Sequence, residues 1–148
     1  MRCLVQRVLS ASVSVSGETL GSVEKGYMIL LGVKNIDSET VADKMVKKVL
    51  DARLFEDENG KTNLSIRDIS GSILVVSQFT LYANTKRGNR PSFIDAGDPA
   101  HAEKLYEYFM QRIREEGIPL QHGKFGADMQ VQLINDGPFT ILYDSDTL

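Results

Sequence analysis

The chain is poor in the residues that build metal centres and disulfide frameworks. Among its 148 residues there are one cysteine, Cys3, two histidines and no tryptophan. A single cysteine cannot form an internal disulfide, which favours a reducing compartment, and Cys3 is interpreted as a buried structural thiol. A zinc site needs clustered Cys, His or carboxylate ligands, which are missing, and the acidic turn Glu56–Gly60 does not have the spacing of a calcium loop. We therefore expect an activity that uses neither metal nor cofactor.

Long apolar segments and glycine-rich nucleotide motifs are also missing. The longest apolar run, Tyr27–Leu31, is far shorter than the ~20 residues that span a bilayer, and the N-terminus lacks the apolar core of a signal peptide. No Walker or dinucleotide glycine motif occurs. The formal charge of -3 argues against a protein that binds nucleic acid through a broad positively charged surface, although a local basic patch remains compatible with it. We expect a soluble, cytoplasmic protein with no membrane partner.

The composition is that of one globular domain over residues 1–148. Hydrophobic residues make up 42% and charged residues 25%, as in ordinary soluble proteins. Alternating or continuous apolar runs predict two strands at Leu4–Val8 and Val13–Val15, a hairpin partner at Leu20–Val23, and a buried strand at Tyr27–Val33. Later runs predict two half-buried strands, Met129–Leu133 and Phe139–Tyr143. The order of strands and helices predicts an α/β domain whose antiparallel hairpins pack beside helices.

Two helices are predicted from caps and apolar spacing. The first begins at Asp37 or Ser38, and the second begins at Asp98-Pro99 and ends at Gly117. Each has one apolar stripe at three- and four-residue spacing, which predicts a single buried face. The two stripes are Ala42, Met45, Val46, Val49 and Leu50, and Ala102, Leu105, Tyr106, Phe109 and Ile113.

A strand predicted at Ile73–Tyr82 changes character along its length. Its first four residues are aliphatic, which is typical of a strand buried on both faces, and the run then turns to Ser77, Gln78 and Thr80. Either these groups form a binding or catalytic site held by a rigid strand, or they only make hydrogen bonds to the backbone of a neighbouring loop. The following loop carries Lys86, Arg87 and Arg90, which either solubilise the loop or hold a phosphate.

Two further features have two interpretations each. Arg7 stands in an otherwise apolar strand, so it lies on a solvent face or aims its donors at backbone carbonyls or a carboxylate. Gly137-Pro138 is either a hairpin turn with a trans peptide bond, or a cis peptide bond that points two backbone carbonyls in an unusual direction.

The polar end of the Ile73–Tyr82 stretch offers hydroxyls, an amide and backbone N–H groups, but no strong base is evident in the sequence. Such groups suit the hydrolysis of a substrate that is already activated, such as an ester.

Two motifs together resemble the signature motifs of the D-aminoacyl-tRNA deacylases. They are Ser77-Gln78-Phe79-Thr80-Leu81 and Asn135-Asp136-Gly137-Pro138-Phe139-Thr140, and the resemblance extends over the full length, including Thr85–Phe93 and Gly123–Met129. Phe139 stands where many members carry a smaller aliphatic residue. The resemblance implies mainly antiparallel sheets and two helices, packed as α/β/β layers in a homodimer.

The same resemblance implies the reaction and its residues. The substrates are D-aminoacyl-tRNA and glycyl-tRNA mischarged on tRNA(Ala), with neither DNA nor a membrane as partner. The carbonyls of Gly137 and Pro138, from the partner subunit, hold the α-amino group and exclude L side chains, and Arg7 braces them. Ser77 and Gln78 shape the pocket, Phe79 and Thr80 offer N–H groups to the ester, and the Phe125–Met129 segment receives the terminal adenosine. The tRNA-binding residues are then Phe125, Met129, Lys86, Arg87 and Arg90.

The alternative function is a non-catalytic module that binds tRNA or nucleotides. Lys86, Arg87 and Arg90 would then act without any chemistry at the Ser77–Thr80 segment. A third alternative is a structural dimer with no site at all.

Overall fold

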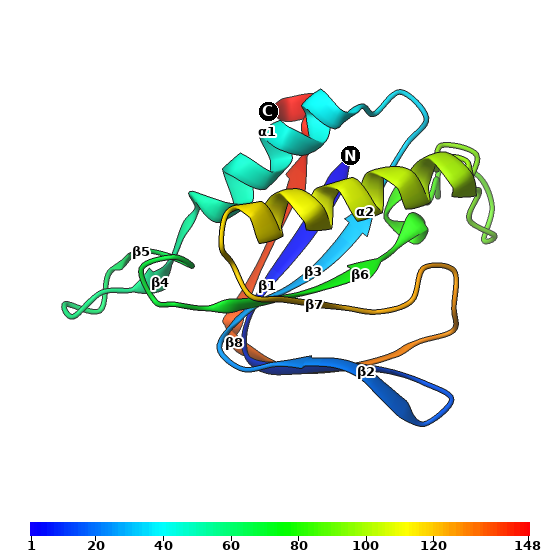
Figure 1. Ribbon diagram of the computed structural model, residues 1–148. Coiled ribbons are helices and arrows are strands. Elements are labelled where there is room, and N and C mark those ends of the chain that lie inside the picture. The colour runs from blue at the N-terminus through cyan, green and yellow to red at the C-terminus, as the bar shows by residue number, and fades with distance from the viewer.

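The computed structural model describes all 148 residues, and they form one α/β domain with two helices (Figure 1). The helices are α1 (Glu39–Leu50) and α2 (Pro99–Glu115), with short 3₁₀ turns η1 (Phe79–Tyr82) and η2 (Ser145–Thr147). The strands are β1 (Arg2–Val15), β2 (Glu18–Val23), β3 (Gly26–Gly32), β4 (Arg53–Glu56), β5 (Thr62–Ser65), β6 (Ser72–Ser77), β7 (Leu120–His122) and β8 (Gln130–Asp144).

Six strands form one mixed sheet. Its order is β2-β1-β3-β6-β7, and β8 pairs along the other edge of β1. All pairs of β1 are antiparallel, as predicted, but β3–β6 and β6–β7 are parallel. Parallel neighbours need a long crossover connection, and the segment containing α1 supplies it between β3 and β6. The expectation of antiparallel pairing is therefore correct for the three partners of β1 and wrong for β3–β6 and β6–β7, which pair in parallel.

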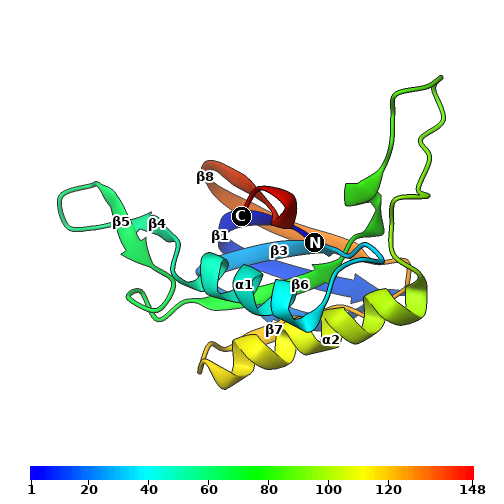
Figure 2. The same cartoon turned by 90° about the horizontal axis from the view of Figure 1, so that it is seen from above.

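The sheet is strongly curled, so that β2 approaches β7 and nearly closes it (Figure 1). The contact is close at Gly21, where an added Cβ would lie 3.0 Å from Cβ of Gln121. Instead of the expected α/β/β layers, the structure has two helices packed over one nearly closed sheet. A smaller, separate pair, β4–β5, projects from the body at the side of the molecule (Figure 2).

Two apolar cores lie on the two faces of this sheet. The larger one contains 24 buried residues and joins both helices to the sheet. Both predicted helix stripes are buried there, and Ser38 caps α1 by accepting a hydrogen bond from the Val41 N–H. The smaller core of seven residues, including Val13, Met28 and Leu74, fills the inside of the curl. Cys3 belongs to the larger core and is 0% exposed, which confirms its interpretation as a buried thiol.

Several strand predictions are corrected. The expected strands Leu4–Val8 and Val13–Val15 are one continuous β1, because its first half pairs with β3 and its second half with β2. The two strands predicted after Gly126 are likewise one β8, with irregular register opposite Gln6–Ser10. The predicted strand Ile73–Tyr82 ends at Ser77 and continues as η1. The short strand β7 was not predicted, because three residues are too few for a pattern.

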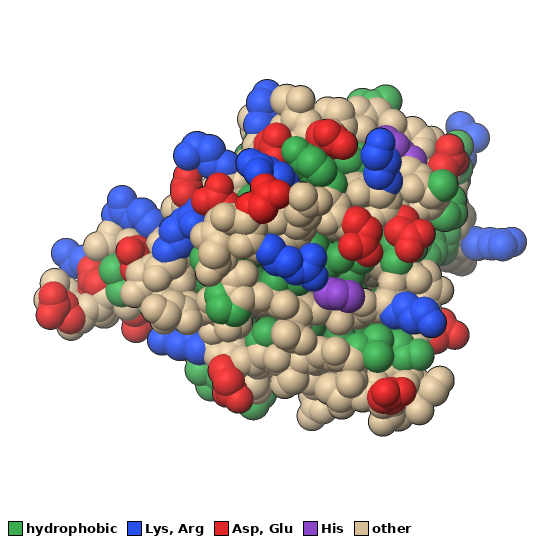
Figure 3. All heavy atoms as spheres, viewed as in Figure 1, with side chains coloured by type: hydrophobic (Ala, Val, Ile, Leu, Met, Phe, Trp, Pro, Cys, Tyr) green, Lys and Arg blue, Asp and Glu red, His purple; other side chains and the backbone are tan.

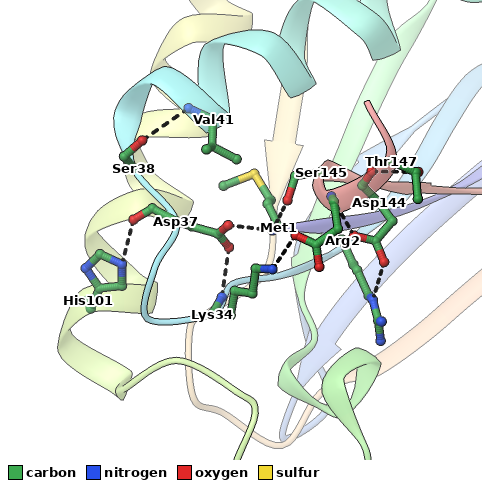
Figure 4. Close-up of polar contacts among 11 residues, drawn as sticks. Met1, Arg2, Lys34, Asp37, Ser38, Val41, His101, Asp144, Ser145 and Thr147 are labelled. Carbon is green, nitrogen blue, oxygen red and sulfur yellow. Dashed lines mark hydrogen bonds and ion pairs between the residues drawn. The ribbon is translucent and has the colours of Figure 1, made fainter.

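The chain ends meet in a polar cluster beside α1 (Figure 4). The Met1 ammonium donates to Asp37 Oδ1 and to Ser145 Oγ, each at 2.6 Å. Burial lowers the pKa of this amine, although Asp37 acts in the opposite direction. Arg2 continues the cluster by donating to Asp144 Oδ2 at 2.8 Å. No helix in the structure combines the length and apolar character that crossing a bilayer requires.

Candidate functional site

The end of β6 delivers polar groups to a concave surface. Ser77 is the last residue of the strand, and Gln78 leads into η1. Both side chains are half-buried, whereas Phe79 is 57% exposed. The core packing of Ile73–Val76 fixes this strand end, because all four residues are buried. Small polar groups are thus held on a rigid element beside an exposed aromatic ring.

The first turn of η1 leaves two backbone donors unused. In a helical turn the first N–H groups have no acceptor within the turn. Neither the Phe79 N–H nor the Thr80 N–H makes a hydrogen bond elsewhere in the protein, whereas the Leu81 N–H donates to the Gln78 carbonyl. Two neighbouring free N–H groups form an arrangement that can stabilise a developing oxyanion.

These groups border a cavity of 810 Å³. Ser77, Gln78 and Phe79 line it, and so do Phe125 and Met129 from the segment that precedes β8. Its walls are mostly apolar but also carry polar side chains, among them the carboxylates of Asp98 and Asp128. Its volume lies in the usual range of small-molecule sites, about 300–1,000 Å³. We call this cavity the substrate pocket. The structure therefore brings together the β6 end and the Phe125–Met129 segment, which lie far apart in the sequence.

Thr80 is placed at the margin of this arrangement. Its side chain is exposed and does not line the substrate pocket, and its Oγ1 accepts a hydrogen bond from Gln78 Nε2. Neither histidine lines the pocket: the ring of His101 contacts the Asp37 carbonyl, and that of His122 contacts the Gly123 carbonyl. Neither imidazole therefore contacts the Thr80 hydroxyl, whose hydrogen-bond partner is the Gln78 amide. The structure also holds no group of three His, Cys, Asp or Glu side chains placed to bind a metal.

The three cations of the predicted basic loop do not enter the substrate pocket. Lys86, Arg87 and Arg90 are exposed on a segment that projects from the body (Figure 2). Its two arms are joined by backbone hydrogen bonds of 2.7 and 2.9 Å between Asn84 and Ser92. None of the three cations forms an ion pair, whereas charges of both signs mix over the helical face (Figure 3). The loop is thus an unneutralised basic projection beside the site.

Arg7 is buried and braces the Gly137–Pro138 segment. Its Nε donates to the Asp136 carbonyl at 2.8 Å and its Nη1 to the Leu54 carbonyl at 2.7 Å. Its guanidinium also lies 4.5 Å from the centroid of the Phe139 ring, which gives the aromatic residue at this position a packing role. Of the two interpretations of Arg7, the structure confirms donors aimed at backbone carbonyls, and the Asp136 carboxylate also lies 3.4 Å from Nε as an ion pair.

The Gly137–Pro138 peptide bond is cis, and both residues are exposed. A Cβ added at Gly137 would lie 2.2 Å from the Phe139 nitrogen, so no larger residue fits this backbone unchanged. The trans hairpin considered from the sequence is therefore replaced by the cis form.

Asn135 opens the second motif, and its side chain holds the backbone of that motif in place. Its Nδ2 donates to the Arg7 carbonyl at 2.8 Å and to the Phe139 carbonyl at 2.9 Å. Its Oδ1 accepts from the Phe139 N–H at 3.0 Å. The side chain closes the base of the Gly137–Pro138 segment with these three bonds. A polar residue four positions before Phe139 was the available signal, since an asparagine often bonds nearby backbone in turns.

Within one chain the two motifs lie apart. Val8 pairs with Asn135 on β8, and through β3 it lies level with Ser72, the first residue of β6. Ser77 is at the opposite end of β6. The Gly137–Pro138 segment consequently does not line the substrate pocket of its own chain.

Comparisons with known proteins agree over the whole chain. A family model described as D-Tyr-tRNA(Tyr) deacylase matches residues 4–144. A D-aminoacyl-tRNA deacylase of Lactobacillus helveticus is 52% identical over 97% of this chain and 99% of its own length. One of Thermosipho melanesiensis is 53% identical over 98% and 97%, respectively.

Solved structures show the same fold. One described as c-Myc DNA Unwinding Element Binding Protein has a TM-score of 0.92 at 42% identity and covers 97% of this chain and 98% of that one. Another, described as a probable eukaryotic D-amino acid tRNA deacylase, has a TM-score of 0.83 at 16% identity, with coverage of 96% and 97%. The second likeness speaks for the fold alone.

Proposed function

This chain belongs to the D-Tyr-tRNA(Tyr) deacylase family and is a hydrolase of aminoacyl-tRNA esters, and from that premise we propose how its site selects and cleaves them. The substrate is D-aminoacyl-tRNA, whose ester is hydrolysed to free D-amino acid and tRNA. L-aminoacyl esters are rejected, so the enzyme proofreads chirality in translation. The observation that carries the proposal is the pair of free N–H groups at Phe79 and Thr80 beside a pocket that also contains Phe125 and Met129.

The terminal adenosine occupies the apolar part of the substrate pocket. Phe125 packs against Tyr106 with ring centroids 5.7 Å apart, which offers an aromatic wall to a base. Met129 lines the same pocket and supplies a polarisable, adaptable surface. The ester then lies at Ser77, Gln78 and Phe79, the other part of the lining.

Catalysis relies on backbone donors and on the substrate itself. Water attacks the ester carbonyl carbon, and the Phe79 and Thr80 N–H groups stabilise the oxyanion of the tetrahedral intermediate. The bond to the ribose oxygen then breaks, and the proton released by the water passes through the neighbouring 2′-hydroxyl to that ribose oxygen, giving free amino acid and tRNA. The Thr80 hydroxyl is exposed, lies outside the pocket and accepts from Gln78 Nε2, so we assign the attack to water, assisted by the 2′-hydroxyl of the terminal ribose. Ser77 and Gln78 shape the pocket around the ester.

Chirality is read by the Gly137–Pro138 segment of a second subunit. The segment is exposed and lies outside its own chain's pocket, so it is available to complete a neighbouring site. Its carbonyls hold the α-amino group, and an L side chain collides with the backbone whereas a D side chain points outward. Glycine has no side chain to collide, so glycyl-tRNA(Ala) is also hydrolysed.

A homodimer is supported by the surface around β8. This strand of 15 residues pairs only with β1, and its Ile134 and Leu142 side chains are 57% and 51% exposed. Exposed apolar side chains along an edge strand favour burial against a second protein surface. Sedimentation of the active protein tests this: a fully selective monomer would contradict the shared site.

The central experiment compares D-Tyr-tRNA, L-Tyr-tRNA and glycyl-tRNA(Ala) with purified protein, each with and without a chelator. Selective release of D-tyrosine and glycine that is insensitive to the chelator supports the proposal. Equal hydrolysis of both tyrosyl esters contradicts the chiral selection, and loss of activity with chelator contradicts a metal-free mechanism.

A second candidate function is binding without catalysis through Lys86, Arg87 and Arg90. The exposed, unpaired charges of this loop favour it. One relative of known structure is described as a DNA-element-binding protein, so duplex DNA belongs in the comparison. Gel-shift binding of tRNA or DNA with complete retention of the D-tyrosyl ester would support this alternative against hydrolysis.

A further inference from the structure

A second cavity adjoins the substrate pocket. It has a volume of 580 Å³, and Asn35 and Ile94 line both cavities, so they are direct neighbours. Tyr82, Asn84 and Lys86 contribute to the second cavity alone. The basic loop therefore borders this cavity through its first arm, and we call it the Lys86 cavity.

The two amide side chains of the Lys86 cavity have their oxygens occupied. Asn35 Oδ1 accepts from the Asp98 N–H at 2.8 Å, and Asn84 Oδ1 accepts from the Lys86 N–H at 3.1 Å. Each amide therefore retains its NH₂ group, which makes no hydrogen bond within the protein, as a donor. The cavity thus offers two oriented neutral donors to a ligand with acceptor oxygens.

Most charges in the cavity are paired, which leaves one cation and one carboxylate without an ion pair. Arg2 is bound to Asp144 at 2.8 Å, and Lys34 is paired with Asp146 (Figure 4). Arg2 also donates to the Leu81 carbonyl at 2.7 Å. Lys86 has no acidic partner. A single free ammonium with amide donors suits one phosphate group better than a polyanion.

Two other lining groups also lack a partner. The Tyr82 hydroxyl is buried without any hydrogen bond, under the Arg2 guanidinium, which lies 4.7 Å from the ring centroid. Buried hydroxyls are normally satisfied, so this group marks a place that water or a ligand completes. Asp95 forms no ion pair and is the acceptor of the lining, able to receive an exocyclic amine such as that of cytosine.

We propose that the Lys86 cavity is a second nucleotide subsite, which takes the 5′-phosphate of the terminal adenosine and the nucleotide before it. This inference rests on the proposed placement of adenosine in the substrate pocket. Consecutive nucleotides are joined through that phosphate, so the nucleotide before the adenosine must lie in an adjoining space. The Lys86 ammonium and the amides of Asn35 and Asn84 hold the phosphate, and Asp95 faces the base.

Three probes separate the contributions: adenosine, adenosine 5′-monophosphate, and the dinucleotide CpA. Their dissociation constants are measured by calorimetry at low salt with the full chain. One contact between a charged donor and phosphate corresponds to about tenfold in affinity, so the two phosphate-bearing probes are expected to bind about tenfold tighter than adenosine. This gain falls as salt rises, because phosphate binding releases counterions.

Lys86→Ala should remove the gain, and Lys86→Arg should retain it. Lys44→Ala, which removes a lysine charge from the exposed face of α1, is the matched control and should leave the gain in place. Asp95→Asn should weaken CpA more than adenosine 5′-monophosphate, because only CpA carries the second base.

Equal affinities of adenosine and both phosphate-bearing probes would overturn the proposal, as would an unchanged gain in Lys86→Ala. Binding is measured without any ester, so the subsite is tested independently of catalysis. Failure to hydrolyse D-Tyr-tRNA would instead contradict the proposed deacylation, and the two failures are therefore distinguishable.

Discussion

Replacement of Arg7 by methionine tests the link between the core and the Gly137–Pro138 segment. Methionine keeps an unbranched apolar stem of similar reach but removes every donor of the guanidinium. The two backbone carbonyls that accept from Arg7 lose their donor, and the cost differs between them. The Leu54 carbonyl contact is buried, whereas the Asp136 contact is only partly buried and water replaces some of it.

The expected loss of stability follows from these two bonds. Hydrogen bonds from a charged donor contribute about 1.5–3 kcal/mol each, and a buried carbonyl left without a donor costs about 1–3 kcal/mol. With the Asp136 carbonyl partly hydrated, the free energy of unfolding should fall by about 2–4 kcal/mol. Urea unfolding followed by circular dichroism measures it.

Selectivity should fall as well, because the same side chain fixes the Asp136 carbonyl next to Gly137. A positioning contact worth about 1.4 kcal/mol corresponds to a tenfold change, so the ratio of D-Tyr-tRNA to L-Tyr-tRNA hydrolysis should drop about tenfold. Rates are measured below the urea range in which the variant begins to unfold, so that the ratio reports the folded protein.

The control is Arg67→Met. Arg67 donates to the exposed carboxylate of Glu116 at 3.1 Å on the surface, where such pairs contribute about 0–1 kcal/mol. This variant should keep both stability and the hydrolysis ratio. A folded Arg7→Met protein with the original stability and the original ratio would refute the bracing role of Arg7.

Three shorter predictions address other groups. Thr80→Ala should retain substantial deacylation, because it keeps the backbone N–H and loses only an exposed hydroxyl; near-total loss, with a trapped acyl-enzyme in the original protein, would show a nucleophile instead. Cys3 is fully buried and burial raises the pKa of its thiol, so Ellman's reagent should label it only at the rate of global unfolding, and rapid labelling of folded protein would contradict this. Hydrogen bonds from the Lys61 and Asn59 N–H groups, with Asn63 adding a third, hold the pKa of Asp57 below its usual value. Stability from this turn is therefore present above pH ~4 and lost as pH falls through the lowered pKa. Amide protection factors in β4–β5, corrected for the intrinsic exchange rate at each pH, should therefore fall in that range in the original chain and not in Asp57→Asn.

Local patterns were sufficient for much of the fold. Both helices were predicted with their buried stripes, since three- and four-residue spacing of apolar side chains leaves one packing solution. The β1–β2 hairpin was likewise readable, and so was the buried first part of the strand at Ile73, but its end at Ser77 was not, because η1 was taken for more strand. A 3₁₀ turn of four residues has too short a pattern to be separated from a strand end.

The pairing of strands was not readable from local patterns. The parallel neighbours β3–β6 and β6–β7 depend on how the α1 and α2 crossovers return to the sheet, and the closure at Gly21 depends on the curl of all six strands. Both are contacts between segments far apart in sequence, for which periodicity carries no information.

For the site, the motifs of the sequence and their resemblance to the deacylases predict the candidate residues, which are the Ser77–Thr80 run, the Phe125–Met129 segment, and the Gly137-Pro138 pair with Arg7. The tertiary structure decided what they face. It showed the Phe79 and Thr80 N–H groups free, placed Phe125 in the same pocket, and set Gly137–Pro138 outside it. Side-chain identity is a local property and is written in the chain, whereas an unused donor or a shared cavity exists only after distant segments have packed together.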